Sequence, residues 1–204
     1  MKNKIIAVIG AGGKTTLIHR LAEEYRRKGA SVLVGTTTHM LVEPDTDLSC
    51  DSFAIMEKIK KTGYCMAGAV CPENSAKMQS LPEQMLHDLM KQVDYALIEA
   101  DGAKHYALKY PSEQEPVIPE GTTDVILVLG SWDLGKPCKD VVFRFEHMTS
   151  ALGISGDMKA DKQMLQWIWQ AYEEKLKNMD YQGHFHVLLS EKTDQGLMFH
   201  ILEE

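Results

Sequence analysis

The sequence predicts an α/β protein with a mostly parallel sheet and helices on both faces, and three observations lead to this expectation. The first is an apolar run, residues 5–9, that leads into a glycine-rich turn and then into a helical pattern over residues 14–28. The second is another apolar run, 31–35, because a helix between two such strands implies a right-handed parallel crossover. The third is two later apolar runs, 94–99 and 124–130, typical of strands buried on both faces.

Length and composition suit a single domain, residues 1–204, with a real hydrophobic core. Hydrophobic residues make up 44% of the chain and charged residues 25%, which is typical of soluble globular proteins. The net charge is −7, and the only basic cluster is residues 26–28 on one helix face, so we expect no nucleic-acid partner. No apolar run reaches the roughly 18 residues of a membrane span, so we expect no membrane insertion.

Cysteine usage and the N-terminal pattern both favour a cytoplasmic protein. The four cysteines are Cys50, Cys65, Cys71 and Cys138. None of their spacings is C-x-x-C, so we expect free thiols in a reducing compartment. Lys2 and Lys4 followed by apolar residues look like the start of a signal peptide, but the apolar run is too short and ends in glycines before Lys14. We therefore expect a buried first strand over residues 4–9.

The glycine-rich turn has the composition of a phosphate-binding loop. Its glycines let backbone N–H groups point toward an anion, and the start of the following helix adds unpaired N–H groups. Lys14 is expected to bridge the β- and γ-phosphates of a nucleotide, and the Thr15 hydroxyl to ligate Mg²⁺. The turn thus predicts a Walker A motif, or P-loop, and a P-loop NTPase-like three-layer fold. The residues assigned to the nucleotide are Gly10, Ala11, Gly12, Gly13, Lys14, Thr15 and Thr16.

The loop departs from the usual Walker A spacing in one respect. Val8 stands where the usual pattern has its first glycine, and the glycines lie close before the Lys-Thr pair instead. Loops of that variant often carry a second lysine, at the position held here by Ile9. Without that lysine, we do not expect a dimer that exchanges it across an interface.

Two carboxylates lie at and just after the end of the apolar run 94–99, at the place where P-loop proteins hold Mg²⁺ or its water shell. Glu99 ends the run, and Asp101 can share its face because side chains alternate along an extended strand. Either carboxylate could orient the attacking water, and the sequence does not choose between them. Glu99-x-x-Gly102 also has the spacing of a γ-phosphate sensor. Lys104 is a candidate contact for a phosphate or a substrate anion.

Three threonines and a histidine follow the strand predicted over 31–35. In open parallel sheets the ligand lies at the carboxyl ends of the strands. Thr36, Thr37, Thr38 and His39 are therefore candidates for a substrate or switch segment, with hydroxyls for phosphate, for a Mg²⁺-bound water or for substrate.

The remaining segments are less specific. We expect helices over 52–61, 81–92, 141–152 and 161–177, strands over 64–70 and 184–189, and irregular loops over 44–51, 106–120 and 131–137. His184 and His186 have the spacing of a metal pair on one strand face, but no further Cys or His partner is evident nearby. Lys192 and Asp194 follow that strand where many GTP-binding P-loop proteins read the base. Glu191 replaces the asparagine of that signature, which leaves ATP and GTP open.

Taken together, these motifs resemble those of the selenium-dependent hydroxylase accessory protein family (YqeC). The resemblance rests on Ile9–Thr16, Thr36–Met40, Glu99–Lys104, Glu115–Pro119, Gly135–Pro137 and Lys192–Asp194. It implies nucleotide binding and a role in the maturation of selenium-containing molybdenum hydroxylases, and it implies no particular reaction.

Three functions are compatible with these residues. The first is a slow NTPase that uses Mg²⁺ with ATP or GTP, with Lys14, Glu99 and Asp101 as catalytic residues and a molybdenum hydroxylase or its cofactor as client. The second is a kinase or nucleotidyl transferase acting on a small molecule. The third is a binding module gated by nucleotide without hydrolysis. The base preference and the oligomeric state stay open.

Overall fold

The computed structural model describes residues 3–203, and the chain divides into two compact units. The first unit comprises the N-terminal segment up to Val8, then Thr15–Gly102 and Val117–Asp124. The second unit comprises Ile9–Lys14, Ala103–Pro116 and the segment from Val125 to the end of the chain. The expected single domain is neither confirmed nor contradicted by this division, and it stays a prediction.

Helices and strands alternate along the chain as the sequence predicts. The elements up to residue 99 are β1 (Lys4–Gly10), α1 (Lys14–Arg27), β2 (Val32–Thr36), β3 (His39–Leu41), α2 (Ser52–Thr62), β4 (Tyr64–Met66), β5 (Ala69–Val70), β6 (Lys77–Gln79), α3 (Glu83–Met90) and β7 (Tyr95–Glu99). The later elements are β8 (Leu108–Lys109), β9 (Asp124–Gly130), α4 (Cys138–Val141), β10 (Val142–Phe143), α5 (Phe145–Leu152), α6 (Lys162–Asn178), β11 (His184–Thr193) and β12 (Gly196–Glu203).

The main sheet has seven strands in the order β12-β11-β9-β1-β7-β2-β4 and is mostly parallel, which confirms the predicted fold class of a P-loop NTPase-like α/β protein. β7 pairs in parallel with β1 on one side and with β2 on the other. Because the two neighbours run in the same direction as β7, all three strands present their carboxyl ends at one edge. The hairpin β11–β12 is antiparallel.

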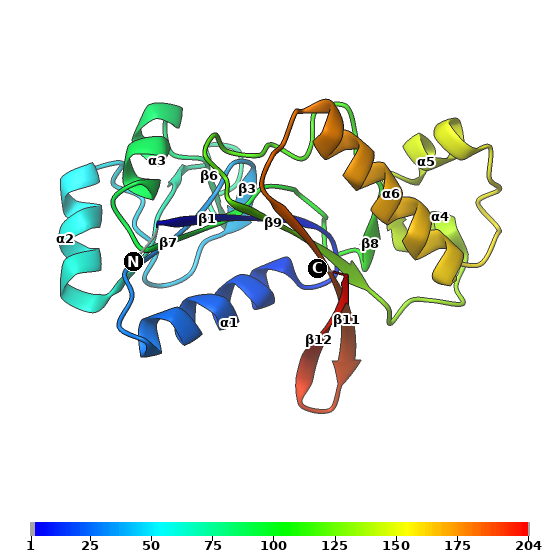
Figure 1. The fold of residues 1–204 in the computed structure, drawn as a ribbon, viewed down its shortest axis with the longest axis horizontal. Helices are drawn as coiled ribbons and strands as arrows, with labels where there is room; N and C mark the ends of the chain where they lie inside the picture. The colour runs from blue at the N-terminus through cyan, green and yellow to red at the C-terminus, as the bar shows by residue number, and fades with distance from the viewer. Residues whose placement is uncertain (1–2, 204) are drawn as a thin grey trace. The chain divides into compact units, whose positions relative to one another are not determined.

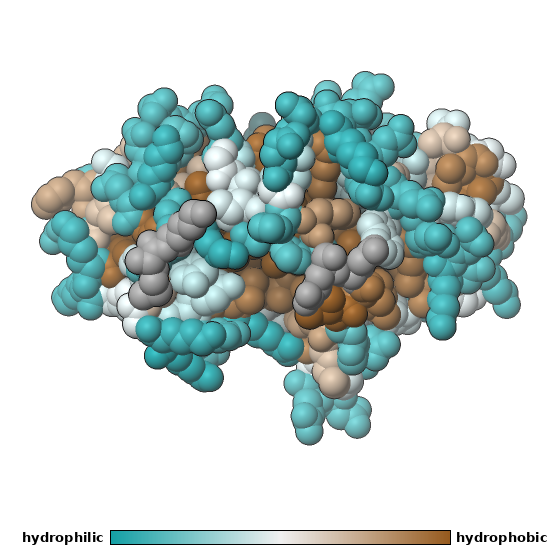
Figure 2. Space-filling model, viewed as in Figure 1, coloured by the Kyte–Doolittle hydropathy of each residue, from teal (hydrophilic) through white to brown (hydrophobic). Residues whose placement is uncertain are grey.

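The first unit has helices on both sides of its strands, with α1 on one side and α3 on the other (Figure 1). One part of its core joins α2, α3 and the strands through fully buried side chains such as Ile55, Leu89, Ile98 and Leu33. The opposite helix, α1, buries Leu17 and Ile18 and turns its charged side chains outward, where Figure 2 shows a hydrophilic surface. This is the amphipathic pattern that the sequence predicts for the segment.

Several predicted elements differ from those in the structure. The strand expected over 64–70 divides around Gly68 into β4 and β5, and β5 belongs to a separate three-stranded sheet. A Cβ on Gly68 would lie 2.6 Å from Met78 Sδ of β6, so glycine permits this close approach. The helix expected over 141–152 is also divided. Arg144 adopts a left-handed backbone, with φ of 62°, and this separates α4 and β10 from α5.

The last part of the chain contains a strand that the prediction lacks. The strand expected over 184–189 continues to Thr193, and β12 follows after a two-residue turn. The loop expected over 106–120 holds the short strand β8. Across residues 3–203, none of the helices combines the length and the apolar character that a membrane crossing requires.

Candidate functional site

The glycine loop between β1 and α1 has a backbone that glycine alone accommodates without strain. φ is +84° at Gly10, +88° at Gly12 and +109° at Gly13, all in the left-handed region. A Cβ on Gly10 would lie 2.4 Å from Val128 O, and one on Gly12 would lie 2.5 Å from Gly130 N. The loop is thus enclosed by the backbone of β9, and Ala11 N–H donates to Val128 O at 2.9 Å.

Lys14 lies over this loop and does not extend into solvent. Its side chain is buried, and Nζ donates to Gly10 O at 2.9 Å, so the ammonium curls back over the residues that precede it. This is a position from which the ammonium could transfer to an anion held by the loop. An ammonium directed at bulk solvent would have contradicted the expected role of Lys14, and the structure does not place it there.

The next residue, Thr15, belongs to the first unit, and the unit boundary falls at the peptide bond between Lys14 and Thr15. Within the first unit, Thr15 Oγ1 donates to Glu99 Oε2 at 2.8 Å. Glu99 ends β7 and is 7% exposed. A hydroxyl beside a carboxylate is the kind of oxygen pair that Mg²⁺ prefers, so the two residues fit a magnesium site.

The structure distinguishes the two candidate carboxylates by their surroundings. Glu99 contacts the hydroxyl at the start of α1, whereas Asp101 lies two residues further on and is fully buried. Gly102 follows Asp101 and is partly exposed. The geometry therefore favours Glu99 as the carboxylate beside Thr15. The catalytic role of Asp101 stays a prediction.

The threonine segment is engaged with the ends of neighbouring strands. Thr36 Oγ1 donates to Glu99 O at 2.8 Å and accepts from Thr38 N–H at 3.0 Å, while Thr37 Oγ1 donates to Val117 O at 2.7 Å. Two of the three predicted hydroxyls thus serve as donors to backbone carbonyls. His39 begins β3 and is exposed. A substrate or switch role for this segment stays a prediction.

The residues expected to read the base lie in the second unit, at the hairpin β11–β12. Lys192 Nζ lies 4.6 Å from the centre of the Trp132 ring, and Asp194 is exposed in the turn that joins the two strands. The rings of His184 and His186 are 6.3 Å apart. Within residues 3–203, no group of three or more His, Cys, Asp or Glu side chains is arranged to hold a metal ion.

The structure adds contacts to the glycine loop that the sequence pattern does not reveal. Ser190 Oγ of β11 donates to Gly12 O. A Cβ on Gly13 would lie 2.5 Å from Leu197 Cδ1 of β12, so this side chain closes against the loop. Ser190 and Leu197 are far from the loop in sequence, and no spacing rule links them to it.

The fold and the glycine loop define an α/β protein of the P-loop NTPase-like class. A family model described as "YqeC protein" matches residues 6–146. The chain is also 34% identical over 161 residues to "Uncharacterized protein YqeC" of Escherichia coli (strain K12), in a match that covers 75% of this chain and 62% of that relative. The chain belongs to the YqeC family, which confirms the resemblance.

The chain spans 62% of the length of this curated relative. The activity, substrates and partners of the whole protein are therefore proposals. No solved structure matches the chain.

Proposed function

We propose that this chain binds a Mg²⁺-nucleotide at its glycine loop and hydrolyses it slowly, as an accessory factor in the maturation of selenium-dependent molybdenum hydroxylases. The observation that carries the proposal is the 2.8 Å hydrogen bond between Thr15 Oγ1, at the start of α1, and Glu99 Oε2, at the end of β7. It joins the residue that follows the loop lysine to the acid at the end of a neighbouring parallel strand, as Mg²⁺ binding in this class of fold requires.

In this proposal each residue has a defined part. The N–H groups from Gly12 onward receive the phosphates, and Lys14 exchanges its bond with Gly10 O for one with a phosphate oxygen. The Thr15 hydroxyl and the Glu99 carboxylate would hold Mg²⁺, and Asp101 would orient the attacking water. When bound, Mg²⁺ neutralises charge that develops on the phosphates. Positioning and electrostatics would supply most of the catalysis.

The maturation role rests on family membership together with the resemblance of the ordered motifs. The relative in Escherichia coli is described as uncharacterized, so it adds no activity to the argument. The nucleotide would regulate the grip on a client enzyme or its cofactor by ordering the segments after Thr36 and Gly102.

Replacing Lys14 with alanine tests the binding step. We expect Lys14→Ala to abolish measurable affinity for Mg²⁺-ATP and Mg²⁺-GTP in isothermal titration calorimetry, because the loop loses its cation. Lys28→Ala is the matched control: its side chain is exposed, lies just beyond the end of α1 and pairs with Glu24 of that helix. Equal affinity of Lys14→Ala and Lys28→Ala would remove the glycine loop from the proposed site.

Nucleotide choice and reaction type follow from two further assays. A ligand present at 100 times its dissociation constant adds roughly 2.7 kcal/mol of stability, so a thermal-shift series with ATP, GTP and CTP plus Mg²⁺ reports the preferred base. Turnover without any acceptor supports hydrolysis. Strict dependence on an added acceptor would instead assign a transferase, and tight binding without turnover would assign a nucleotide-gated binding module.

A further inference from the structure

A short parallel pair of strands in the second unit brings an aromatic ring and several cations together. β8 and β10 pair in parallel, with Lys109 opposite Phe143, and Tyr110 N–H donates to Phe143 O at 3.0 Å. This register places the Lys109 ammonium 5.6 Å from the centre of the Phe143 ring, and the Lys109 side chain is fully buried. A lysine in such a position is costly to bury and therefore needs a reason.

Two more cations approach the same ring, one from a separate segment and one from the residue that follows Phe143. The ring centre lies 5.3 Å from Lys104 Nζ and 5.3 Å from Arg144 Cζ. Tyr106 lies beside Phe143 as well, with 5.6 Å between ring centres, and its side chain reaches the surface. We call this group of Lys104, Tyr106, Lys109, Phe143 and Arg144 the Phe143 cluster.

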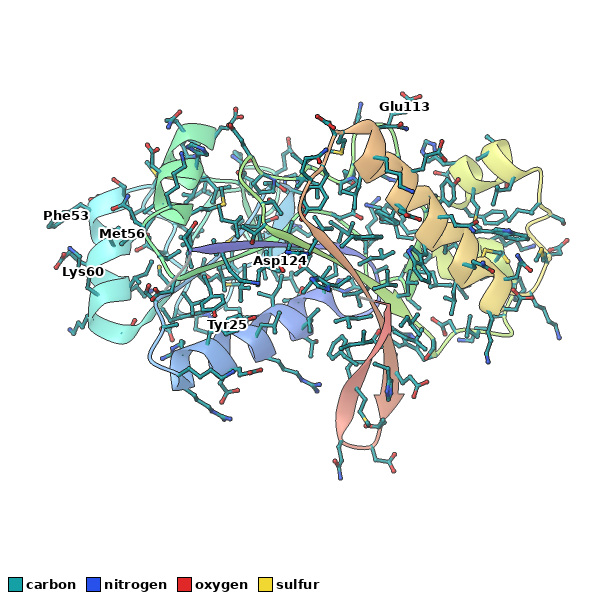
Figure 3. The ribbon with its side chains drawn as sticks, viewed as in Figure 1. Tyr25, Phe53, Met56, Lys60, Glu113 and Asp124 are labelled. Carbon is teal, nitrogen blue, oxygen red and sulfur yellow. The ribbon has the colours of Figure 1, made fainter. Side chains whose placement is uncertain are left out.

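One carboxylate holds two of these cations in place. Glu115 Oε2 lies 2.6 Å from Lys109 Nζ and 2.8 Å from an Arg144 guanidinium nitrogen, and Arg144 also donates to Ser112 Oγ. The segment that carries Glu115 is itself fixed, because Lys175 Nζ of α6 donates to Ser112 O and to Glu113 O. The Glu113 side chain projects outward, away from α6 (Figure 3), and adds no carboxylate to the cluster.

Lys104 is the exception within the cluster. Its side chain is exposed, and its ammonium forms no ion pair with any acid in residues 3–203. The face of the Phe143 ring attracts this ammonium but does not neutralise its charge. An anion from outside the chain would complete the arrangement.

Two members of the cluster, together with the neighbouring His105, have a strained backbone. Lys104, His105 and Arg144 have φ of 45°, 66° and 62°, and they are three of the five non-glycine residues with positive φ in the described chain. Residues held in this region of φ and ψ tend to occur at ligand clamps and functional sites. The strain occurs at both edges of the cluster, on segments that are far apart in the sequence.

We propose that the Phe143 cluster binds the oxyanion group, phosphate or carboxylate, of a small-molecule ligand, through residues other than those of the glycine loop. Lys104 is the mobile cation that closes on the anion, and the phenol of Tyr106 lies at the rim as a further donor. Arg144 and buried Lys109 supply the surrounding positive potential, and Glu115 keeps both cations in position when the ligand is absent. The proposal requires no nucleotide.

The test is a titration with inorganic phosphate at pH 8, and with malonate in a parallel arm, by isothermal titration calorimetry. The background is the full chain carrying Lys14→Ala, so that phosphate at the glycine loop does not contribute. We expect saturable binding of at least one probe. Binding of phosphate alone assigns a phosphorylated ligand, and binding of malonate alone assigns a carboxylated one.

In this background, Lys104→Gln should weaken binding roughly tenfold or more, the loss expected for one charge-assisted hydrogen bond. Lys104→Arg should retain most of the affinity, and the matched surface change Lys28→Gln should leave it unchanged. If Lys14→Ala does not fold, the difference between Lys104→Gln and Lys28→Gln in the otherwise unaltered chain decides the question.

The proposal is overturned if neither probe gives saturable binding, or if Lys104→Gln binds the probes as tightly as Lys28→Gln does. The nucleotide proposal is tested separately, by titration with Mg²⁺-nucleotide. Its failure can therefore be distinguished from failure of the oxyanion site, which is tested with phosphate and malonate alone.

Discussion

Gly12 is enclosed by backbone on two sides, which makes it unusual even among the loop glycines. A Cβ at this position would lie 2.5 Å from Gly130 N and 2.7 Å from Ala107 O, and φ is +88°. Gly29 has a similar φ of +81° at the end of α1, but a Cβ there would meet no atom within 4 Å. A comparison of the two positions therefore separates the free-energy cost of a steric clash from the cost of an unfavourable φ.

We predict that Gly12→Ala destabilises the fold by roughly 3 kcal/mol or more, because left-handed strain adds to a backbone clash that no side-chain rotation relieves. Gly29→Ala should cost only about 1 kcal/mol, from backbone preference alone. Urea denaturation of both variants measures the difference. Equal losses of stability in the two variants would mean that the segments carrying Ala107 and Gly130 move aside easily and relieve the clash with the added methyl group.

Single residues also show how far sequence reasoning reached into the candidate site. The sequence predicted that Thr15 and Glu99 both lie at the magnesium site, from the spacing of the glycine loop and from the acid at the end of an apolar strand. The structure brings the two side chains into contact. The choice between Glu99 and Asp101 needed geometry, since two residues on one strand face satisfy the same pattern. Of the Phe143 cluster, the sequence analysis named Lys104 as a candidate contact for an anion, but it did not bring Lys109 and Arg144 to the same place, because these two residues lie in short segments without periodicity.

Among elements, β2 and β7 are tied together at their beginnings. Asp94 Oδ2 accepts from Ser31 N–H at 2.9 Å and from Ser31 Oγ at 2.8 Å, and Asp94 N–H donates back to Ser31 Oγ at 2.9 Å. The hydrogen bonds from Ser31 hold the pKa of Asp94 below its usual value of 3.8. A carboxyl with a lowered pKa stabilises the fold where it is ionised, and that contribution is lost as pH falls through its pKa in the folded protein.

We predict that Asp94→Asn lowers the free energy of unfolding by about 1–2 kcal/mol at pH 7, the contribution of hydrogen bonds to a charged acceptor. The difference from the parent chain should shrink as pH falls below 3.8, where the parent carboxyl also becomes neutral. Denaturation curves at neutral and acidic pH test this. Asp157→Asn is the control, since that fully exposed carboxyl pairs with Lys139 on the surface and should contribute little. A penalty for Asp94→Asn that does not depend on pH would contradict the assignment.

Elements with strong local signals were predicted well. α1, β1, β7, β9 and α6 have long apolar periods or buried runs, and their observed bounds lie close to those expected. The prediction failed where one residue overrides a local pattern. Arg144 with positive φ interrupts a helical pattern. β12 pairs with β11, and its apolar residues 197–199 and 201–202 are a signal that the prediction did not use.

For the whole molecule, burial determines the chemistry of the thiols. The four cysteines are unpaired; Cys50 is partly exposed, whereas Cys65, Cys71 and Cys138 are buried. Burial raises the pKa of Cys65 to about 11 and also raises that of Cys138. Since the thiolate is the reactive form, both groups are protected twice, by their low accessibility and by their protonation.

We predict that one cysteine, Cys50, reacts rapidly with a thiol reagent in the native chain at pH 8, and that all four react in denaturant. Peptide mapping after brief labelling identifies the modified position. Labelling of Cys65 at a rate similar to that of Cys50 would show that its surroundings open readily, contrary to its complete burial.

The enclosure of the glycine loop limits how its sequence can be reused. Its curvature depends on Val128 and Gly130 of β9, on Ala107, and on Ser190 and Leu197 of the last hairpin, all of which lie within the second unit. A heptapeptide with the sequence of residues 10–16, placed in another scaffold, would lack these surrounding residues, and its backbone would no longer be held in this conformation. A transplant of the motif would also need the downstream segment that shapes it, from Ala107 to Leu197, and sequence change in that segment is constrained by a turn near the start of the chain.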